Sequence, residues 1–313
     1  MPGTAYAFLR GEYVPLADAK IGIVTHAFNY GTAVFEGIRA NWNADEEQFY
    51  LFRVREHFER LRKSASILMM KLDYTDDELV EIATKVVGMG GFSEDLYLRP
   101  MVYKAEEVIG VRLHDVADDF LLYSSPFGAY LDVEAGIHCC TSTWRRVDDT
   151  SIPARAKVNG IYVNSALAKT EAHNNGYDEA IMLNMDGHVS EGSGENVYII
   201  NDGVIYTPPS QDNILVGITR ATVIELAAKE LGLTTVERTL DRSELYIADE
   251  VFMSGTAAHV TPVLSVDKRE IAGGKIGPQT AKLQSLFFDA ILGRLPKYQH
   301  WVTPVRAERL VKA

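Results

Sequence analysis

Apolar residues recur at helical spacing in two neighbouring stretches of the N-terminal part of the chain. In the first stretch they stand three or four positions apart, at Val54, Phe58, Leu61, Ala65 and Leu68. This spacing is typical of an amphipathic helix. The second stretch opens with Thr75-Asp76-Asp77-Glu78, which has capping-box spacing, and continues with an apolar stripe at Leu79, Ile82, Ala83, Val86 and Val87. We therefore predict two consecutive helices.

Shorter apolar runs predict strands before and after these helices. The predicted strands cover residues 6–14, 21–25, 96–103, 120–124, 178–184, 196–200 and 204–206. Two Asp-Gly pairs, at 186–187 and 202–203, are typical hairpin turns. Further helices are predicted at 219–231, directly after 241–244, and at 278–292.

Strands and helices mixed in two blocks indicate an α+β protein with two domains. We predict a small N-terminal domain over residues 1–125, a connector over 126–137 that includes Pro126-Phe127-Gly128, and a larger domain over 138–313. A cleft between two such domains is a common place for a ligand site.

Composition narrows the possible functions. The chain has 313 residues, of which 47% are hydrophobic, enough to bury a large core. A formal net charge of −12 repels the phosphate backbone and argues against nucleic acid as a partner. No apolar run approaches the roughly 18 residues of a membrane helix, and the start lacks a signal-peptide pattern. We expect no membrane partner and a cytoplasmic location.

The two cysteines, Cys139 and Cys140, are adjacent, so they offer neither a disulfide framework nor metal-ligand spacing. We predict that both are packing residues in a reducing compartment, and we expect no metal. His173 and His259 have no acidic partner at useful spacing and are interpreted as surface or supporting groups.

Three segments carry candidate chemistry. Lys157 lies among small and apolar residues before a helical stretch, where lost solvation would lower its pKa and let its amine attack a carbonyl to form a Schiff base. Ser190-Glu191-Gly192-Ser193-Gly194-Glu195-Asn196 combines glycines with two acids between strands. Val216-Gly217-Ile218-Thr219-Arg220 is a glycine turn leading into a helix, which suits a phosphate.

Each segment also has an ordinary explanation, which is favoured when the segment is taken alone. These explanations are a solvated lysine, a turn with solvated acids, and a helix capped by threonine. Together, a Schiff-base lysine, an acid and a phosphate cup match the aldehyde, ring nitrogen and phosphate of pyridoxal 5'-phosphate.

Seven motifs in order resemble the branched-chain amino-acid aminotransferases of the class IV, fold-type IV pyridoxal phosphate enzymes. They begin at His26 and end near Pro262. They are His26-Ala27-Phe28-Asn29-Tyr30-Gly31-Thr32-Ala33-Val34-Phe35-Glu36-Gly37-Ile38-Arg39, Arg55-Glu56-His57-Phe58-Glu59-Arg60-Leu61, Tyr97-Leu98-Arg99-Pro100, the Lys157 and Glu191 segments, Gly217-Ile218-Thr219-Arg220, and Phe252-Met253-Ser254-Gly255-Thr256-Ala257-Ala258.

The resemblance implies transamination of leucine, isoleucine and valine with 2-oxoglutarate by a ping-pong cycle, with the cofactor in the cleft between the domains. It makes Lys157 the Schiff-base lysine and acid–base group, Glu191 the partner of the pyridine nitrogen, and Tyr162 the partner of the 3' oxygen. It implies phosphate binding by Arg60, Gly217, Ile218, Thr219 and Thr256.

For the substrate, the resemblance implies a pocket of aromatic and apolar residues, a turn that receives the α-carboxylate, and an arginine for the side-chain carboxylate of glutamate. The pocket residues are Tyr30, Phe35, Tyr97, Val111 and Tyr130, the turn is Thr256-Ala257-Ala258, and the arginine is Arg99. Tyr30 and the loop 108–111 are expected to reach the site of a second subunit, so the resemblance implies a homodimer or a higher oligomer.

Three alternatives remain open. Phe127 and the loop 106–112 depart from the pattern that is usual in close bacterial relatives, which leaves a D-amino acid or (R)-amine transaminase possible. A lyase of the same fold and a non-catalytic vitamin B6 carrier are the others. Apart from these functions, the 97–100 motif could be an edge strand with a solvated arginine.

Overall fold

The computed structural model describes residues 3–306, and the chain divides into two compact units. The first unit comprises residues 1–128, 156–160 and 289–313, and the second comprises 129–155 and 161–288. The domain prediction cut the chain at a single connector. It therefore differs from these units by placing 156–160 and the C-terminal stretch in the larger domain. Lys157 belongs to the first unit.

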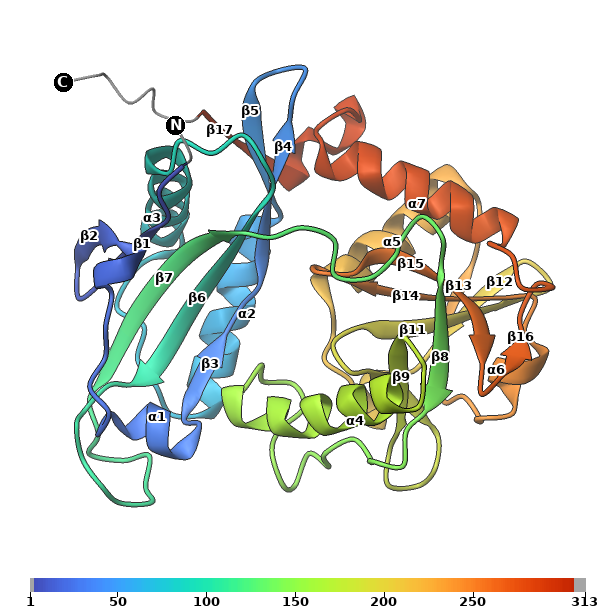
Figure 1. The fold of residues 1–313 in the computed structure, drawn as a ribbon, viewed down its shortest axis with the longest axis horizontal. Coiled ribbons are helices and arrows are strands. Elements are labelled where there is room, and N and C mark those ends of the chain that lie inside the picture. The colour runs from blue at the N-terminus through green and yellow to red at the C-terminus, as the bar shows by residue number, and fades with distance from the viewer. Residues whose placement is uncertain (1–2, 307–313) are drawn as a thin grey trace. The chain divides into compact units, whose positions relative to one another are not determined.

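The first unit is built on an antiparallel sheet with strand order β17-β5-β4-β6-β7-β1-β2, in which β3 also pairs with β6 (Figure 1). Its strands are β1 (Tyr6–Leu9), β2 (Glu12–Pro15), β3 (Ala33–Phe35), β4 (Ile38–Asn43), β5 (Gln48–Phe52), β6 (Leu96–Lys104), β7 (Asp118–Pro126) and β17 (Val302–Val305). The C-terminal strand β17 forms one edge by pairing with β5, from Val302 opposite Phe52 to Val305 opposite Phe49.

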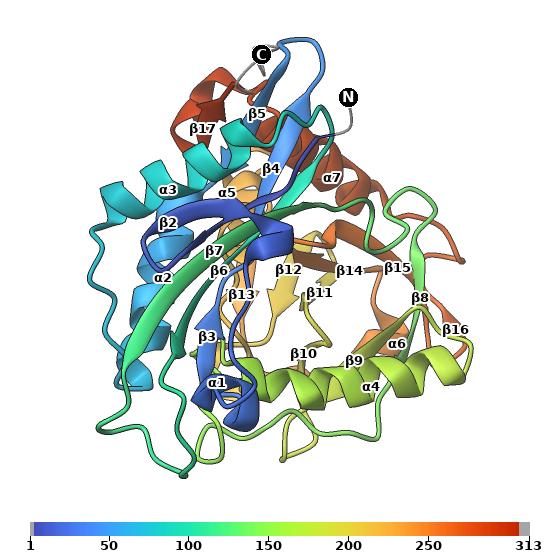
Figure 2. The same cartoon turned by 60° about the vertical axis from the view of Figure 1, so that its left-hand side comes forward.

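The two helices predicted from apolar spacing are confirmed as α2 (Val54–Ile67) and α3 (Asp76–Met89). They pack against each other and on the sheet, α2 at β3 and β6, and α3 at β1 and β7 (Figure 2). The capping box of α3 is formed, because the Glu78 amide donates to Thr75 Oγ1 over 3.3 Å and the Thr75 amide donates to Glu78 Oε2 over 2.7 Å.

The strand predicted at 21–25 is wrong. These residues form turns with one isolated bridge, from Thr25 to Glu107, and the one-turn helix α1 (His26–Tyr30) follows. The apolar run suggested a strand, yet Ile21, Ile23 and Val24 are exposed. Their apolar side chains therefore cover no core of this chain.

The second unit is built on a mixed sheet with strand order β10-β9-β8-β15-β14-β11-β12-β13, and β16 pairs with β15. Its strands are β8 (Ile137–Thr141), β9 (Glu179–Leu183), β10 (Val189–Gly192), β11 (Asn196–Asn201), β12 (Val204–Thr207), β13 (Thr235–Glu237), β14 (Glu250–Gly255), β15 (His259–Val266) and β16 (Arg269–Glu270). Three neighbouring pairs are parallel: β8 with β9, β8 with β15, and β12 with β13.

The predicted helices of the second half are confirmed as α5 (Ile218–Glu230), α6 (Glu244–Ile247) and α7 (Pro278–Ile291), the last continuing into the first unit. The helix expected after Lys157 is α4 (Tyr162–Asn174), which packs on β9, while α5 packs on β14 and β13. Short 3-10 turns occupy Leu16–Asp18, Asn159–Ile161, Ser210–Asp212 and Pro296–Trp301.

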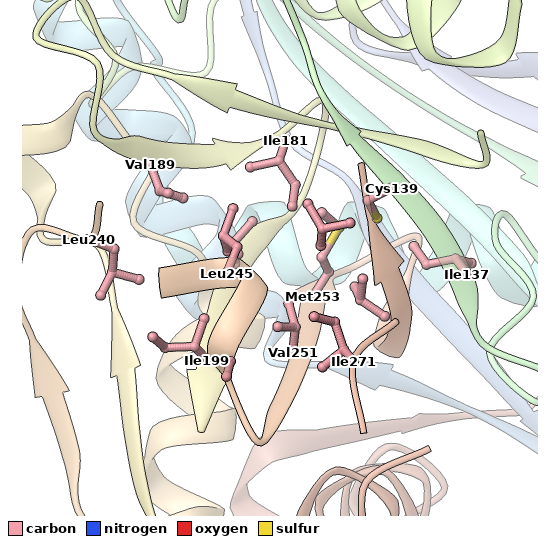
Figure 3. Packing of buried hydrophobic residues seen from close by; sticks show 14 of the residues in the cluster. Ile137, Cys139, Ile181, Val189, Ile199, Leu240, Leu245, Val251, Met253 and Ile271 are labelled. Atoms are coloured by element: carbon pink, nitrogen blue, oxygen red, sulfur yellow. The ribbon is translucent and has the colours of Figure 1, made fainter. Parts of the chain in front are cut away.

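The core of the second unit is formed by apolar side chains from several strands and from α6 (Figure 3). Ile181, Val251 and Met253 lie near its centre and are at most 2% exposed. Both cysteines are buried thiols, and Cys139 belongs to this core, as predicted. Among the helices of residues 3–306, none has the length and apolar character that crossing a membrane requires.

Candidate functional site

Lys157 is held by its backbone between a strand and a helix of the first unit. Its carbonyl accepts a hydrogen bond from the Phe35 amide over 3.0 Å, and its amide donates to Ser64 Oγ on α2 over 3.2 Å. Its Nζ lies 4.9 Å from the centre of the Phe35 ring. The side chain is half-buried, which does not fit a lysine standing free in solvent.

Arg60 on α2 forms a two-point ion pair with Glu36, which follows β3. Arg60 Nε donates to Glu36 Oε1 and Nη2 donates to Oε2, both over 2.7 Å. His57, one turn earlier on α2, lies with Nδ1 2.7 Å from Glu36 Oε2. Burial alone would raise the pKa of Glu36, but the charge of Arg60 and hydrogen bonds from Arg60 and His57 lower it to about 2. Glu36 is therefore a buried carboxylate.

Arg99 and two aromatic residues of the predicted pocket lie together in the first unit. The Arg99 guanidinium stands 4.2 Å from the ring centre of Phe35, and its Nη2 donates to Tyr97 Oη over 3.2 Å. Because β6 lies between β4 and β7, Arg99 is on an interior strand, which rules out the edge-strand alternative. Arg99 Nε is buried and has no hydrogen-bond partner among the described residues.

Tyr30 and Val111, the other predicted pocket residues of this unit, lie apart from that group. Tyr30 Oη accepts a hydrogen bond from the Gly110 amide over 3.1 Å, which ties the end of α1 to the loop 108–111. Val111 is 91% exposed. Tyr30 is 37% exposed.

Glu191, in the second unit, is a buried carboxylate with several donors. It lies on β10, so the predicted turn begins only at Ser193. Arg146 Nε is 2.8 Å from its Oε1, while its Oε2 accepts from the Leu215 amide over 3.0 Å and from Asn196 Nδ2 over 3.4 Å. These donors fix the direction of the Glu191 carboxylate.

The glycine turn predicted to hold a phosphate is the N-terminus of α5. Gly217 is the N-cap, and no side chain caps the helix, so the alternative of an ordinary threonine cap is wrong. A Cβ on Gly217 would lie 2.3 Å from Asn196 Oδ1, so a larger residue here would displace the Asn196 side chain. Ile218 and the buried Thr219 form the first turn, where backbone amides point out of the helix.

The remaining predicted residues also belong to the second unit. Tyr162 is the first residue of α4, and Thr256 and Ala257 follow β14 in a half-buried turn that ends at the buried Ala258. The Tyr130 ring centre lies 5.1 Å from Lys169 Nζ. Burial and the nearby charge of Glu195 raise the pKa of the Tyr130 phenol.

Glu195 is a buried acid of the same motif as Glu191, and the sequence suggested no separate role for it. Its Oε2 accepts a hydrogen bond from the Gly194 amide over 3.0 Å. Burial and the charge of Glu179, which itself pairs with Lys169 Nζ over 2.6 Å, raise the pKa of Glu195 to about 8. Burial beside a second acid therefore favours the protonated form of Glu195.

Sequence reasoning missed three polar residues that support this site: Glu36, Ser64 and Arg146. Glu36 belongs to the motif at 26–39, but the sequence assigned it no role. His57 and Arg60 are three residues apart on a predicted helix, which indicated that their side chains could bind the same partner. Arg146 had no such sign, because its partner Glu191 is 45 residues away in the sequence.

Comparison with known proteins gives the class first. The family model described as amino-transferase class IV matches residues 33–266, which is more than half of the chain. The chain belongs to the class IV aminotransferases.

Several relatives within this class share one name, branched-chain amino-acid aminotransferase. A probable branched-chain-amino-acid aminotransferase of Aquifex aeolicus is 51% identical over 300 residues, 96% of each chain. The crystal structure of a branched-chain aminotransferase from Thermoproteus uzoniensis with norvaline has a TM-score of 0.92 and 44% identity, covering 96% of this chain and 99% of the other. That of a branched-chain amino acid aminotransferase from Thermobaculum terrenum in its PLP-form has a TM-score of 0.92 and 36% identity, covering 97% and 99%.

Proposed function

We propose that this protein transfers the amino group of L-leucine, L-isoleucine or L-valine to 2-oxoglutarate, with pyridoxal 5'-phosphate as cofactor. The observation that carries this function is the near-complete match, in sequence and fold, to branched-chain aminotransferases. The motif residues agree with it, because each chemical group that the cofactor presents has a matching group on the chain.

Groups that suit the cofactor are present in each unit. The first unit contains the amine of Lys157 and the guanidinium of Arg60, and the second contains the carboxylate of Glu191 and the N-terminus of α5. The glycine cradle at Gly217 and the fixed anion at Glu191 fit a phosphate and a protonated pyridine nitrogen. The cofactor supplies an electrophilic aldehyde and a ring that accepts electrons.

Each residue then has a defined task in the proposed mechanism. The amine of Lys157 would hold the cofactor and would move a proton to and from the substrate Cα. Glu191 would pair with the ring nitrogen, and Tyr162 would donate to the 3' oxygen. Arg60 would hold the phosphate, together with Gly217, Ile218, Thr219 and Thr256.

The substrate pocket has to accept an apolar side chain in one half of the cycle and a carboxylate in the other. Phe35, Tyr97 and Tyr130 provide apolar walls, and the turn Thr256-Ala257-Ala258 offers amides to the α-carboxylate. The buried, unpartnered Arg99 Nε supports a role for this arginine in binding the side-chain carboxylate of glutamate. The apolar side chain of leucine, isoleucine or valine would pack against the same rings and leave the Arg99 N–H unused.

A homodimer is part of the proposal, with Tyr30 and Val111 reaching the site of the other subunit. Its support is the apolar surface formed by residues 21–30 and 107–111, which we call the α1 surface. Ile23, Phe28 and Ile109 are 80%, 69% and 76% exposed there, so it suits burial against a second copy. We also propose a cytoplasmic location, which agrees with two neighbouring cysteines that remain thiols.

The decisive experiment separates the two half-reactions. Adding L-leucine without an acceptor should convert the absorption of the lysine-bound cofactor to that of pyridoxamine phosphate, and 2-oxoglutarate should reverse the change. Borohydride should trap the cofactor on the peptide that contains Lys157. Lys157→Ala should abolish transamination while retaining some bound cofactor.

Two outcomes would contradict the proposal. An unchanged spectrum with all three branched-chain amino acids would remove the assigned activity and leave a vitamin B6 carrier. Conversion by D-amino acids or (R)-amines, but not by L-leucine, would assign the chain to another transaminase of the same fold.

A further inference from the structure

Glu36 occupies a position that the mechanism above does not use. It is completely buried, and its carboxylate receives hydrogen bonds at 2.7 Å from Arg60 Nε, from Arg60 Nη2 and from His57 Nδ1. The Arg60 side chain is 15% exposed and His57 only 2%. The Glu36 carboxylate is thus the most buried group of this cluster, and the Arg60 side chain is the most exposed.

A buried ion pair is a poor means of stabilising a fold, because desolvation of both charges offsets most of their attraction. A pair of apolar residues would fill the same volume as well or better. The two-point geometry does give one definite result: it fixes the plane of the guanidinium, since Nε and Nη2 are both held. The other N–H bonds of Arg60 are then directed away from Glu36.

Residues 35 and 36 lie beside Lys157 as well as beside Arg60. Phe35, next to Glu36, donates its amide to the Lys157 carbonyl, and the Glu36 amide donates to the Pro100 carbonyl over 2.9 Å. The Lys157 amide is bonded to Ser64, one turn after Arg60 on α2. Residues 35 and 36 therefore link the arginine and the lysine within the first unit.

We infer that Glu36 is the positioning residue for the phosphate end of the cofactor site, acting by orienting the Arg60 guanidinium. This inference rests on the proposed role of Arg60. It concerns orientation and not charge, because an anion beside Arg60 reduces the attraction of the arginine for phosphate. Loss of the Glu36 charge should therefore strengthen phosphate binding by Arg60. Loss of the fixed guanidinium orientation should weaken it.

The test compares two ligands of the apoenzyme, pyridoxal 5'-phosphate and pyridoxal, which share the aldehyde and differ in the phosphate. Glu36→Gln replaces one of the two acceptor oxygens by an NH2 group, so the two-point hold on the guanidinium is broken, and we expect this loss to outweigh the gain from removing one negative charge. We expect the Kd for pyridoxal 5'-phosphate to rise about tenfold or more, as for loss of a charge-assisted hydrogen bond. The Kd for pyridoxal should change little, since Lys157 is retained and pyridoxal has no phosphate for Arg60 to bind.

Two further variants make the test specific. Glu36→Asp keeps the charge, but its shorter side chain cannot reach both nitrogens of Arg60, so it should also raise the Kd for pyridoxal 5'-phosphate. This variant replaces Glu36→Gln in the test if Glu36→Gln fails to fold. Asp118→Asn is the matched control, because it breaks another buried ion pair of the same unit, with Lys104 at 2.8 Å. It should leave the preference for the phosphorylated ligand unchanged.

A double-mutant cycle checks that Glu36 acts through Arg60. In an Arg60→Ala background, Glu36→Gln should cause no further loss of the preference for pyridoxal 5'-phosphate. Tighter binding of pyridoxal 5'-phosphate by Glu36→Gln, or equal losses for both ligands, would overturn the inference. If Arg60→Ala itself retained the full preference, the proposed phosphate role of Arg60 would fail instead.

Discussion

At the scale of single residues, the site places carboxylates of opposite character within one motif. Glu191 bonds to a guanidinium and two amide donors, whereas Glu195, four residues later, is buried beside another acid. The sequence shows two equivalent glutamates. Their different surroundings come from partners at distant positions in the chain, which no local pattern reveals.

Arg146 gives the first prediction. Replacing Arg146 with Gln removes the cation beside the buried Glu191, so its carboxylate should bind a proton more readily and hold the ring nitrogen less firmly. We expect turnover to fall roughly 10- to 100-fold, as for loss of a hydrogen bond between charged groups. The absorption spectrum of the bound cofactor should become pH-dependent in a range where the wild type is constant. Arg146→Lys should restore part of both properties, and unchanged spectra in both variants would contradict the prediction.

Glu195 gives a prediction about pH. Its folded-state pKa of about 8 lies above its ordinary value of 4.5, so the folded protein retains a proton that the unfolded chain releases. Its contribution to stability is complete below about pH 4.5 and is lost as the pH rises to about 8. Glu195→Gln should therefore lose less stability than the wild type between these values. Melting temperatures across this pH range measure the difference, and parallel curves for the two proteins would exclude it.

At the scale of elements, the helices were the most predictable part of the molecule. Their apolar spacing and caps are local, so α2, α3, α5 and α7 could be predicted directly from the sequence. Strand partners could not, because pairs such as β5 with β17 join residues at opposite ends of the chain. The site was predictable as a set of motifs, while Glu36, Ser64 and Arg146 became visible only through their contacts.

The capping box of α3 gives a prediction for a single element. Thr75→Ala removes the oxygen that accepts the Glu78 amide, and we expect the free energy of unfolding to fall by about 1 kcal/mol. Thr84→Ala is the control, since the Thr84 hydroxyl only donates to the Glu81 carbonyl within the same helix. Urea denaturation measures both variants. An equal effect of the two would show that the cap contributes nothing specific.

At the scale of the whole molecule, the α1 surface is the part of the structure best suited to a second copy. It is held in shape by His26, which lies within 2.8 Å of the Gly110 carbonyl, and by the hydrogen bond from the Gly110 amide to Tyr30. A surface that is both apolar and fixed loses little entropy when it is covered.

Ile109→Asp should shift the protein towards monomers and reduce activity most at low protein concentration. The reason is that the carboxylate must lose its water in a covered apolar surface. Ile247→Asp is the control, because Ile247 is 78% exposed in the second unit, outside the α1 surface. Sedimentation velocity checks both variants. A fully active wild-type monomer would contradict the homodimer proposal.

The pairing of β17 with β5 has a consequence for synthesis of the protein. Phe52 meets Val302 in this ladder, so β5 is made about 250 residues before its edge partner exists. At roughly 5–20 residues per second, a ribosome leaves that edge uncovered for tens of seconds. The nascent N-terminal half therefore presents an open sheet edge that chaperones or other nascent chains can occupy. Fusing a copy of the last strand ahead of residue 1 should shorten this exposure and raise the yield of folded protein.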